Sequence, residues 1–122
     1  MYEISVEDYT QIIKVRFKGN YGIDEIEAYH KKLTTISLPE RVLIIEDYRD
    51  AIPDLCSCDL EKLVEISTKT LPIKKNFRIA FISDSPISMA LAHVVGDRLN
   101  SETFNHKAFS SEEAARKWLM EY

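Results

Sequence analysis

The residues that could do chemistry in this sequence follow its apolar runs, where charged and hydroxyl side chains gather. An arginine in such a place can bind an anion or pair with a partner's carboxylate, and a tyrosine can supply contact area. The structural alternative is that Asp47 and Arg49 form a salt link within a loop and that Asp84 caps a helix. The candidate binding residues are Asn20, Tyr21, Asp47, Tyr48, Arg49, Ile52, Ser57, Asp84 and Ser85.

Recognisable catalytic motifs are absent from the sequence. It has no glycine-rich phosphate loop, no G-x-S-x-G motif and no paired-carboxylate motif. None of its three histidines stands at a ligand spacing such as H-E-x-x-H, so His30, His93 and His106 are expected to be ordinary surface or helix residues. Residues can still converge from distant strands. We therefore assign no catalytic residue, no metal ion and no cofactor, and an enzyme is the least favoured class.

The two cysteines, Cys56 and Cys58, form a C-x-C pair. The first eight residues carry three acidic side chains and lack the apolar stretch of a signal peptide. No apolar run approaches the ~20 residues needed to span a bilayer. These features predict a cytoplasmic protein, in which both cysteines are free structural thiols. A disulfide and half of a metal site are the alternatives.

Length and charge narrow the classes of partner. The 122 residues suit one domain, residues 1–122, that can bury a core without disulfides or a metal. The formal net charge of −4 argues against general binding to nucleic acid or anionic lipid, which requires a basic face. The pairs Lys31–Lys32 and Lys74–Lys75 are too short to change this and are expected to be solvated surface.

Apolar periodicity predicts alternating strands and helices. In the second predicted strand Ile13, Val15 and Phe17 alternate with charged residues, which is typical of a half-buried strand. The expected strands are Glu3–Val6, Gln11–Lys18, Val42–Glu46, Phe77–Ile82 and Phe104–Phe109. The expected helices are Asp24–Ile36, Asp59–Leu71, one that begins at Pro86 and one opened by Ser110. The expected connections are a tight turn at residues 8–10, a chain break at residues 19–22 and a looser segment at residues 48–56.

Helix ends and buried faces follow from the same patterns. Asp24 is expected to cap the first helix, Asp84 or Ser85 the third, and Ser110 with Glu113 to form a capping box for the last. The third helix is expected to bury Ile87, Ala90, Leu91, Val94 and Val95, with Gly96 allowing close packing or an early end. The aromatic residues expected in the core are Phe17, Phe77, Phe81, Phe109 and Trp118. The apolar residues of segment 48–56 either fold back onto the core or form a partner surface.

The order β-β-α-β-α-β-α-β-α predicts an α/β fold with a single, mostly parallel five-stranded sheet and four helices. The first strand is expected to be the antiparallel one, at one side. In open parallel sheets ligands meet the carboxyl ends of the strands. Asn20, Asp47 and Asp84 are therefore expected at one edge.

Four segments carry a resemblance to a known family: Phe17–Gly19, Ile44–Arg49, Phe77–Ile82 and Ala108–Leu119, the last with a phenylalanine, a capped helix and a Trp-Leu ending. With this pattern the sequence resembles, over nearly its whole length, the STAS-like domains related to bacterial anti-sigma-factor antagonists. The resemblance implies a bacterial regulatory module that binds another protein and is not an enzyme.

One segment departs from that family. Antagonists that work by phosphorylation carry an Asp-Ser-Ser-Gly-type segment before the helix that follows the third strand. Here residues 54–60 read Asp-Leu-Cys-Ser-Cys-Asp-Leu, and no glycine follows Ser57. The departure argues against a phosphorylation switch at Ser57 and leaves a helix cap or a loop hydroxyl as its role.

Two functions remain for comparison. The preferred one is a protein-interaction module that uses the strand-end edge and the first halves of the first two helices. The alternative is a binding protein for a small apolar or lipid-like ligand held between the sheet and the third helix. The identity of a protein partner is open, and so is a homodimer.

Overall fold

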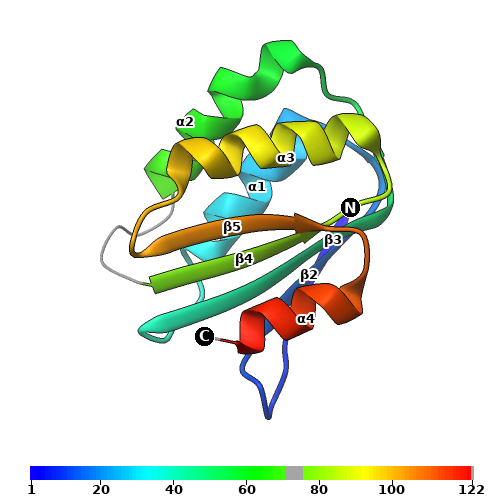
Figure 1. The fold of residues 1–122 in the computed structure, drawn as a ribbon. Coiled ribbons are helices and arrows are strands. Elements are labelled where there is room, and N and C mark those ends of the chain that lie inside the picture. The colour runs from blue at the N-terminus through cyan, green and yellow to red at the C-terminus, as the bar shows by residue number, and fades with distance from the viewer. Residues whose placement is uncertain (71–75, 122) are drawn as a thin grey trace.

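The computed structural model describes residues 1–70 and 76–121 and contains one five-stranded sheet with helices on both faces (Figure 1). In chain order the elements are β1 (Tyr2–Val6), β2 (Ile13–Tyr21), α1 (Ile23–Leu33), β3 (Arg41–Pro53), the 3-10 helix η1 (Ser57–Asp59), α2 (Leu60–Thr70), β4 (Asn76–Ile82), α3 (Pro86–Leu99), β5 (Phe104–Phe109) and α4 (Glu112–Met120). Leu71 and the Lys74–Lys75 pair lie outside the described residues.

The strands lie side by side in sequence order, β1-β2-β3-β4-β5. β1 is antiparallel to β2, and each later pair is parallel. The predicted α/β class, the element order and the antiparallel first strand are therefore confirmed. Among the described residues, no helix has the length and apolar character needed to cross a membrane.

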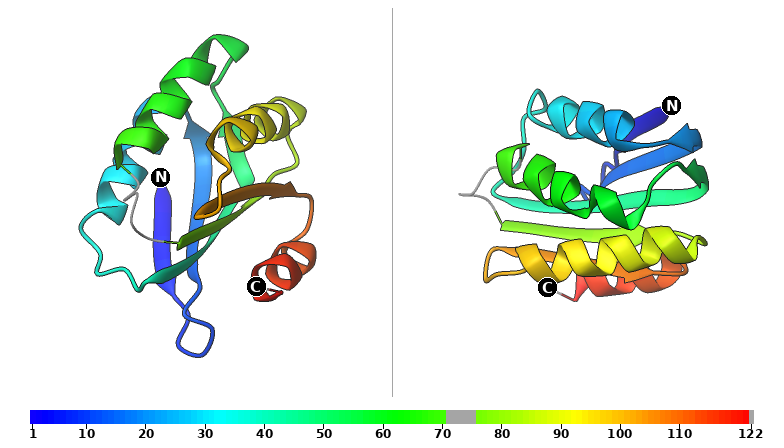
Figure 2. Two further views of the ribbon diagram at one scale, coloured as in Figure 1. Left: turned by 60° about the vertical axis from the view of Figure 1, so that its left-hand side comes forward. Right: turned by 90° about the horizontal axis from the view of Figure 1, so that it is seen from above.

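The helices form two layers around the sheet. Figure 2 shows α1, α2 and α3 over one face and α4 over the other. Successive residues of a strand point to opposite faces, so Val42 and Ile44 of β3 enter the larger core while Leu43 and Ile45 pack in the core beneath α4. Burial on both faces explains why the central strands read as continuous apolar runs.

Two strands are longer than predicted. β2 runs on to Tyr21 and β3 to Pro53, so residues 19–21 do not break the chain and residues 48–53 are not a loop. The two extensions pair with each other, as Asn20 opposite Ile52 shows. Gly19 has φ +73° inside β2, a backbone conformation that glycine adopts without strain, and the strand continues through it. Polar side chains made these residues look like a loop, but pairing of the two extensions satisfies their backbone hydrogen-bonding groups.

Two helix caps are also displaced from their predicted positions. α1 is capped at Gly22, whose N–H donates to the Glu25 carboxylate at 2.8 Å, and the helix ends at Leu33 rather than Ile36. α4 is capped by Ser111, whose Oγ accepts from the Ala114 N–H at 3.3 Å, so the predicted box starting at Ser110 is wrong by one residue.

Replacing Ser111 with alanine is therefore expected to destabilise the protein by about 1 kcal/mol, because α4 loses the acceptor for one of its free N–H groups. Ser110→Ala is the matched control, because Ser110 is the neighbouring exposed serine and makes no cap. Urea unfolding of both variants measures the difference. Equal losses in the two variants would contradict the assignment of the cap.

α3 begins as predicted, with Ser85 as its N-cap and Pro86 in its first turn, but it buries a different face. Ser88, Leu91, Ala92, Val95 and Gly96 are buried, whereas Ile87 and Val94 are each 39 % exposed. This buried face of α3 contacts two strand residues, Tyr21 of β2 and His106 of β5. The Ser88 hydroxyl lies 2.6 Å from the hydroxyl of Tyr21, and the Gly96 backbone packs against His106 of β5.

The two cysteines are not free thiols as expected. Cys56 and Cys58 are joined by a disulfide, the alternative that the sequence left open. The bend that leads from β3 into η1 brings their Cα atoms to 5.2 Å, which is within the range that a disulfide bridges. Both residues are exposed.

Candidate functional site

The residues expected at one edge of the sheet do lie at the carboxyl side of the parallel strands, at two levels. Asp47 is opposite Ile82, the last residue of β4, and Asp84 follows two residues later. Asn20 lies opposite Ile52, farther along the extension that β2 and β3 share. The rim is therefore stepped, with β2 and β3 projecting beyond the end of β4.

The lower step of the rim is the part where β4 ends, and the upper step is the shared extension of β2 and β3. Arg49 and Asp47 form an ion pair at the lower step. Arg49 donates from Nε to Asp47 Oδ1 at 3.0 Å and from Nη2 to Oδ2 at 2.8 Å, and its backbone N–H also donates to Oδ1. The Arg49 hydrogen bonds hold the pKa of Asp47 below its ordinary value although burial opposes them. The hydrogen bond to Asp47, together with the charges of Asp47, Glu112 and Asp84, raises the pKa of Arg49 above its ordinary value.

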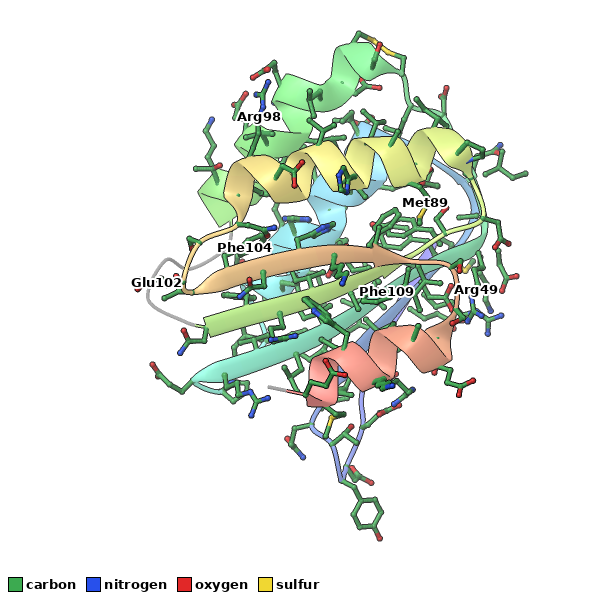
Figure 3. The ribbon with its side chains drawn as sticks, viewed as in Figure 1. Arg49, Met89, Arg98, Glu102, Phe104 and Phe109 are labelled. Carbon is green, nitrogen blue, oxygen red and sulfur yellow. A yellow bond between two sulfur atoms is a disulfide. The ribbon has the colours of Figure 1, made fainter. Side chains whose placement is uncertain are left out.

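This pair continues into an ion network that fastens α4 to the sheet. Glu112, in the first turn of α4, accepts from Arg49 at 3.3 Å, from Lys14 of β2 at 2.9 Å and from Arg116 at 2.8 Å. Arg116 in turn pairs with Glu7, at the end of the β1–β2 hairpin. Figure 3 shows Arg49 beside the start of α4, at the opposite end of the sheet from Glu102 and Phe104. Arg49 is therefore structural as well as partly exposed.

Other candidate residues are distributed between the core and the surface. Tyr48 is 4 % exposed, and its ring stacks on Phe17 with centroids 4.4 Å apart, so it packs in the core instead of offering a contact surface. Tyr21 is also buried, and Ser85 caps α3. Ser57 is exposed as the first residue of η1, whose N-cap is Cys56.

The upper step of the rim surrounds an acidic surface hollow of about 340 Å³. Asn20 and Tyr21 line it together with the start of α1 and with residues that follow β3. Its four carboxylates belong to Asp24, Glu25, Asp54 and Asp59. Glu25 and Asp59 each accept a hydrogen bond from a backbone N–H, whereas Asp24 and Asp54 are exposed. Ile52, 64 % exposed, lies on the same step opposite Asn20.

A second site lies inside the protein, between the sheet and helices α1, α2 and α3. It is a cavity of about 60 Å³ with mostly apolar walls. Glu46 of β3 lines it and is 6 % exposed, and its Oε2 accepts a hydrogen bond from the Tyr29 hydroxyl at 2.6 Å. Burial raises the pKa of Glu46 to about 7, although the Tyr29 hydrogen bond works in the opposite direction.

Two histidines line the same cavity. His30 is a helix residue, which is one of the two expected alternatives, whereas His106 lies on β5 and is neither a surface nor a helix residue. His30 of α1 is 7 % exposed, and burial, followed by the charge of His106, lowers its pKa to about 4. Burial lowers the pKa of His106 on β5 to about 4 as well. Both imidazoles are therefore neutral at neutral pH. His93 is exposed on α3, 3.6 Å from Asp97.

Sequence reasoning missed the interior group, although one signal was present. Within β3, Val42, Ile44, Glu46 and Tyr48 share the face that packs under the helices. A single carboxylate in an otherwise apolar alternation marks a buried titratable group once the strand is known to continue through Tyr48. The sequence instead suggested that the strand ends at Glu46.

Comparison with known proteins shows what this arrangement resembles. No protein-family model and no curated protein matches the chain. Among solved structures, an uncharacterized protein of the DUF3478 family with a SpoIIAA-like fold, from Shewanella loihica PV-4, superposes with a TM-score of 0.59 at 17 % identity, covering 97 % of this chain and 93 % of that one.

An anti-sigma factor antagonist from Mycobacterium paratuberculosis superposes with a TM-score of 0.59 at 16 % identity, covering 98 % of this chain and 95 % of that one. At such identities the likeness concerns the fold. It extends over nearly the whole chain, and the element order and sheet topology agree with it. The chain therefore has a SpoIIAA-like, that is STAS-like, fold.

Proposed function

We propose that this protein is a regulatory protein-interaction module that binds a basic segment of a partner protein at the upper step of its rim. We call this the rim surface and define it by Asn20, Asp24, Ile52 and Asp54. The observation that carries the proposal is the combination of an exposed apolar side chain, Ile52, with an acidic hollow. A large apolar side chain beside charged groups is typical of an interaction site.

Charge supports a basic partner. The hollow is lined by four carboxylates, and two of them, those of Asp24 and Asp54, are exposed. The whole chain has a formal net charge of −4. Complementary charge raises the association rate and excludes acidic partners. The name of one structurally similar protein, an anti-sigma factor antagonist, also refers to action on another protein.

The test is affinity capture from the native lysate with two charge-introducing variants. Ile52→Asp alters the rim surface, and Val94→Asp, on the exposed side of α3, is the matched control. We expect the wild type and V94D to capture the same partner, I52D to lose it, and added salt to weaken capture. Arg49 is left unchanged because it holds the buried carboxylate of Asp47.

Circular dichroism and thermal unfolding show whether each variant is folded. Identical partner sets for wild type and I52D, with both proteins folded, would refute the rim surface. A partner lost equally by I52D and V94D would refute it too, because the effect would then not depend on position.

A second candidate function, binding of a small apolar molecule, would place the ligand in the interior cavity, whose walls are mostly apolar. Its volume of about 60 Å³ is below the ~150 Å³ of a cavity that holds benzene, and far below the ~300 Å³ at which ligand pockets begin. A lipid would therefore require α2 and α3 to separate from the sheet. Native mass spectrometry of freshly purified protein distinguishes the two functions, because a ligand adds a discrete mass and an unliganded chain does not.

A further inference from the structure

The outer border of the sheet at β1 presents free backbone hydrogen-bonding groups. Met1 and Lys18 exchange two backbone hydrogen bonds, and the Glu7 N–H donates to the Ile12 carbonyl. Hydrogen-bonded pairs alternate with non-bonded pairs along an antiparallel ladder. The N–H and C=O groups of Tyr2, Ile4 and Val6 therefore point away from β2 and out of the sheet.

Nothing in the described part of the chain pairs with these outward groups. β1 carries one charged residue, Glu3, but it has no proline, no lysine and no bulge, which are other features that block an edge strand. The opposite border is covered. There the His106 N–H donates to the Asn100 side chain, the Ser101 N–H donates to the Phe104 carbonyl, and the Gly96 backbone packs on the His106 carbonyl.

We propose that β1 pairs with β1 of a second copy of this chain, antiparallel and with the two-fold axis at Ile4. In this register Ile4 faces its own copy and Tyr2 faces Val6. Each outward N–H of one strand then meets an outward C=O of the other. The two sheets become one continuous sheet across the interface.

Charges on both faces of the sheet suit a second copy. On the face opposite the helices α1–α3, Glu3 lies across from Ser5 of the second copy, so no like charges meet. On the helix face, α1 is the helix nearest β1, because the Tyr2 hydroxyl reaches the Ala28 carbonyl at 3.5 Å (Figure 2). The two-fold axis sets the two α1 helices antiparallel. The acidic first turn of α1 in one copy then faces the basic last turn of α1 in the other, which carries Lys31 and Lys32.

The experiment is sedimentation velocity over a concentration series, with two variants of opposite charge. In the proposed register position 5 lies across from Glu3 in a non-hydrogen-bonded pair, where cross-strand side chains are closest. Ser5→Glu places two like-charge pairs across the axis and is expected to weaken the dimer about tenfold. Ser5→Lys places two opposite-charge pairs there and is expected to strengthen it.

Contacts within one copy predict the opposite effect of the two charges. Within one copy residue 5 is opposite Lys14, so the glutamate is the favourable residue for the monomer and the lysine the unfavourable one. A protein that stays monomeric at about 1 mM, where even weak association is detectable, overturns the proposal. A dimer with the same dissociation constant in both variants overturns it as well, because its interface would lie elsewhere.

Proline at position 6 tests the backbone contribution separately. Val6 is 48 % exposed and its N–H points outward, so Val6→Pro removes an interface donor while the ladder with β2 keeps its hydrogen bonds. Val6→Thr is the matched control, because it retains the N–H and the β-branched shape. We expect V6P to abolish the dimer and V6T to preserve it. Equal dimerisation of V6P and V6T would show that β1 is not the interface.

Discussion

Replacing Glu46 with glutamine is expected to stabilise the protein in a pH-dependent way. The Glu46 carboxyl has a pKa of about 7 in the folded protein, against an ordinary value of 4.5. Between these values the folded state binds more protons than the unfolded state, so raising the pH destabilises the fold. The penalty is absent below the lower value and fully present above the higher one, where it reaches about 3 kcal/mol.

The measurement is the free energy of unfolding of wild type and E46Q across this range. The advantage of E46Q is expected to grow by roughly 2 to 3 kcal/mol from about pH 5 to about pH 8. Glutamine keeps an oxygen that can accept from the Tyr29 hydroxyl, so the variant removes the charge while the hydrogen bond remains. His30 and His106 titrate in both proteins, and their contribution cancels in the difference.

Glu102→Gln is the matched control, because Glu102 is exposed in the turn before β5 and keeps its hydration. E102Q removes an exposed carboxylate, so it is expected to lack the gain that removal of a buried charge gives E46Q. An E46Q advantage that does not change with pH would mean that Glu46 is ionised in the folded protein at pH 5, contrary to its burial.

Replacing Gly96 with valine is expected to destabilise the protein by about 3 kcal/mol or more. A Cβ atom at this position would lie 2.9 Å from the His106 carbonyl oxygen and 3.2 Å from its Nδ1. The nearer atom belongs to the backbone of β5, so α3 has to move away from the sheet. Gly96→Ala is expected to lose less, about 1 to 2 kcal/mol, because the helix propensity of alanine offsets part of the clash.

Ala90→Val is the control for the valine substitution, since Ala90 is exposed on the same helix. Its expected cost is only the lower helix propensity of valine, about 0.5 kcal/mol. Chemical unfolding of the three variants gives the order A90V, G96A, G96V with increasing loss. A stability of G96V equal to that of A90V would contradict the close approach of α3 to β5.

The cost at Gly96 also bears on the function. α3 and β5 contribute Leu91, Val95, Phe104 and His106 to the wall of the interior cavity. Moving α3 outward would enlarge this cavity toward the size that small ligands need. Binding of an apolar probe by G96A in native mass spectrometry, with none by wild type, would show that the helix contact keeps the cavity small.

Much of the fold was determined by the sequence alone. Strand 77–82 was predicted to within one residue because a mostly apolar run of this length between turn signals has few other solutions. Strand 104–109 was predicted with the bounds that β5 has. The Ser85–Pro86 start of α3 was equally clear, since the serine caps and the proline has no N–H to satisfy. Alternation of strand and helix led to the mostly parallel sheet.

The site depended on tertiary structure. Residues 48–56 were predicted to be a looser segment, yet β3 continues to Pro53 because residues 50–53 pair with the extension of β2 beyond an irregularity at Tyr48 and Arg49. Partners remote in sequence, Glu112 and Lys14, hold Arg49 and its neighbours in the ion network. Burial of Glu46 and His30 results from three helices closing over one face of the sheet. Local patterns record how a segment prefers to fold, whereas burial and pairing arise from residues far along the chain, and only their assembly decides them.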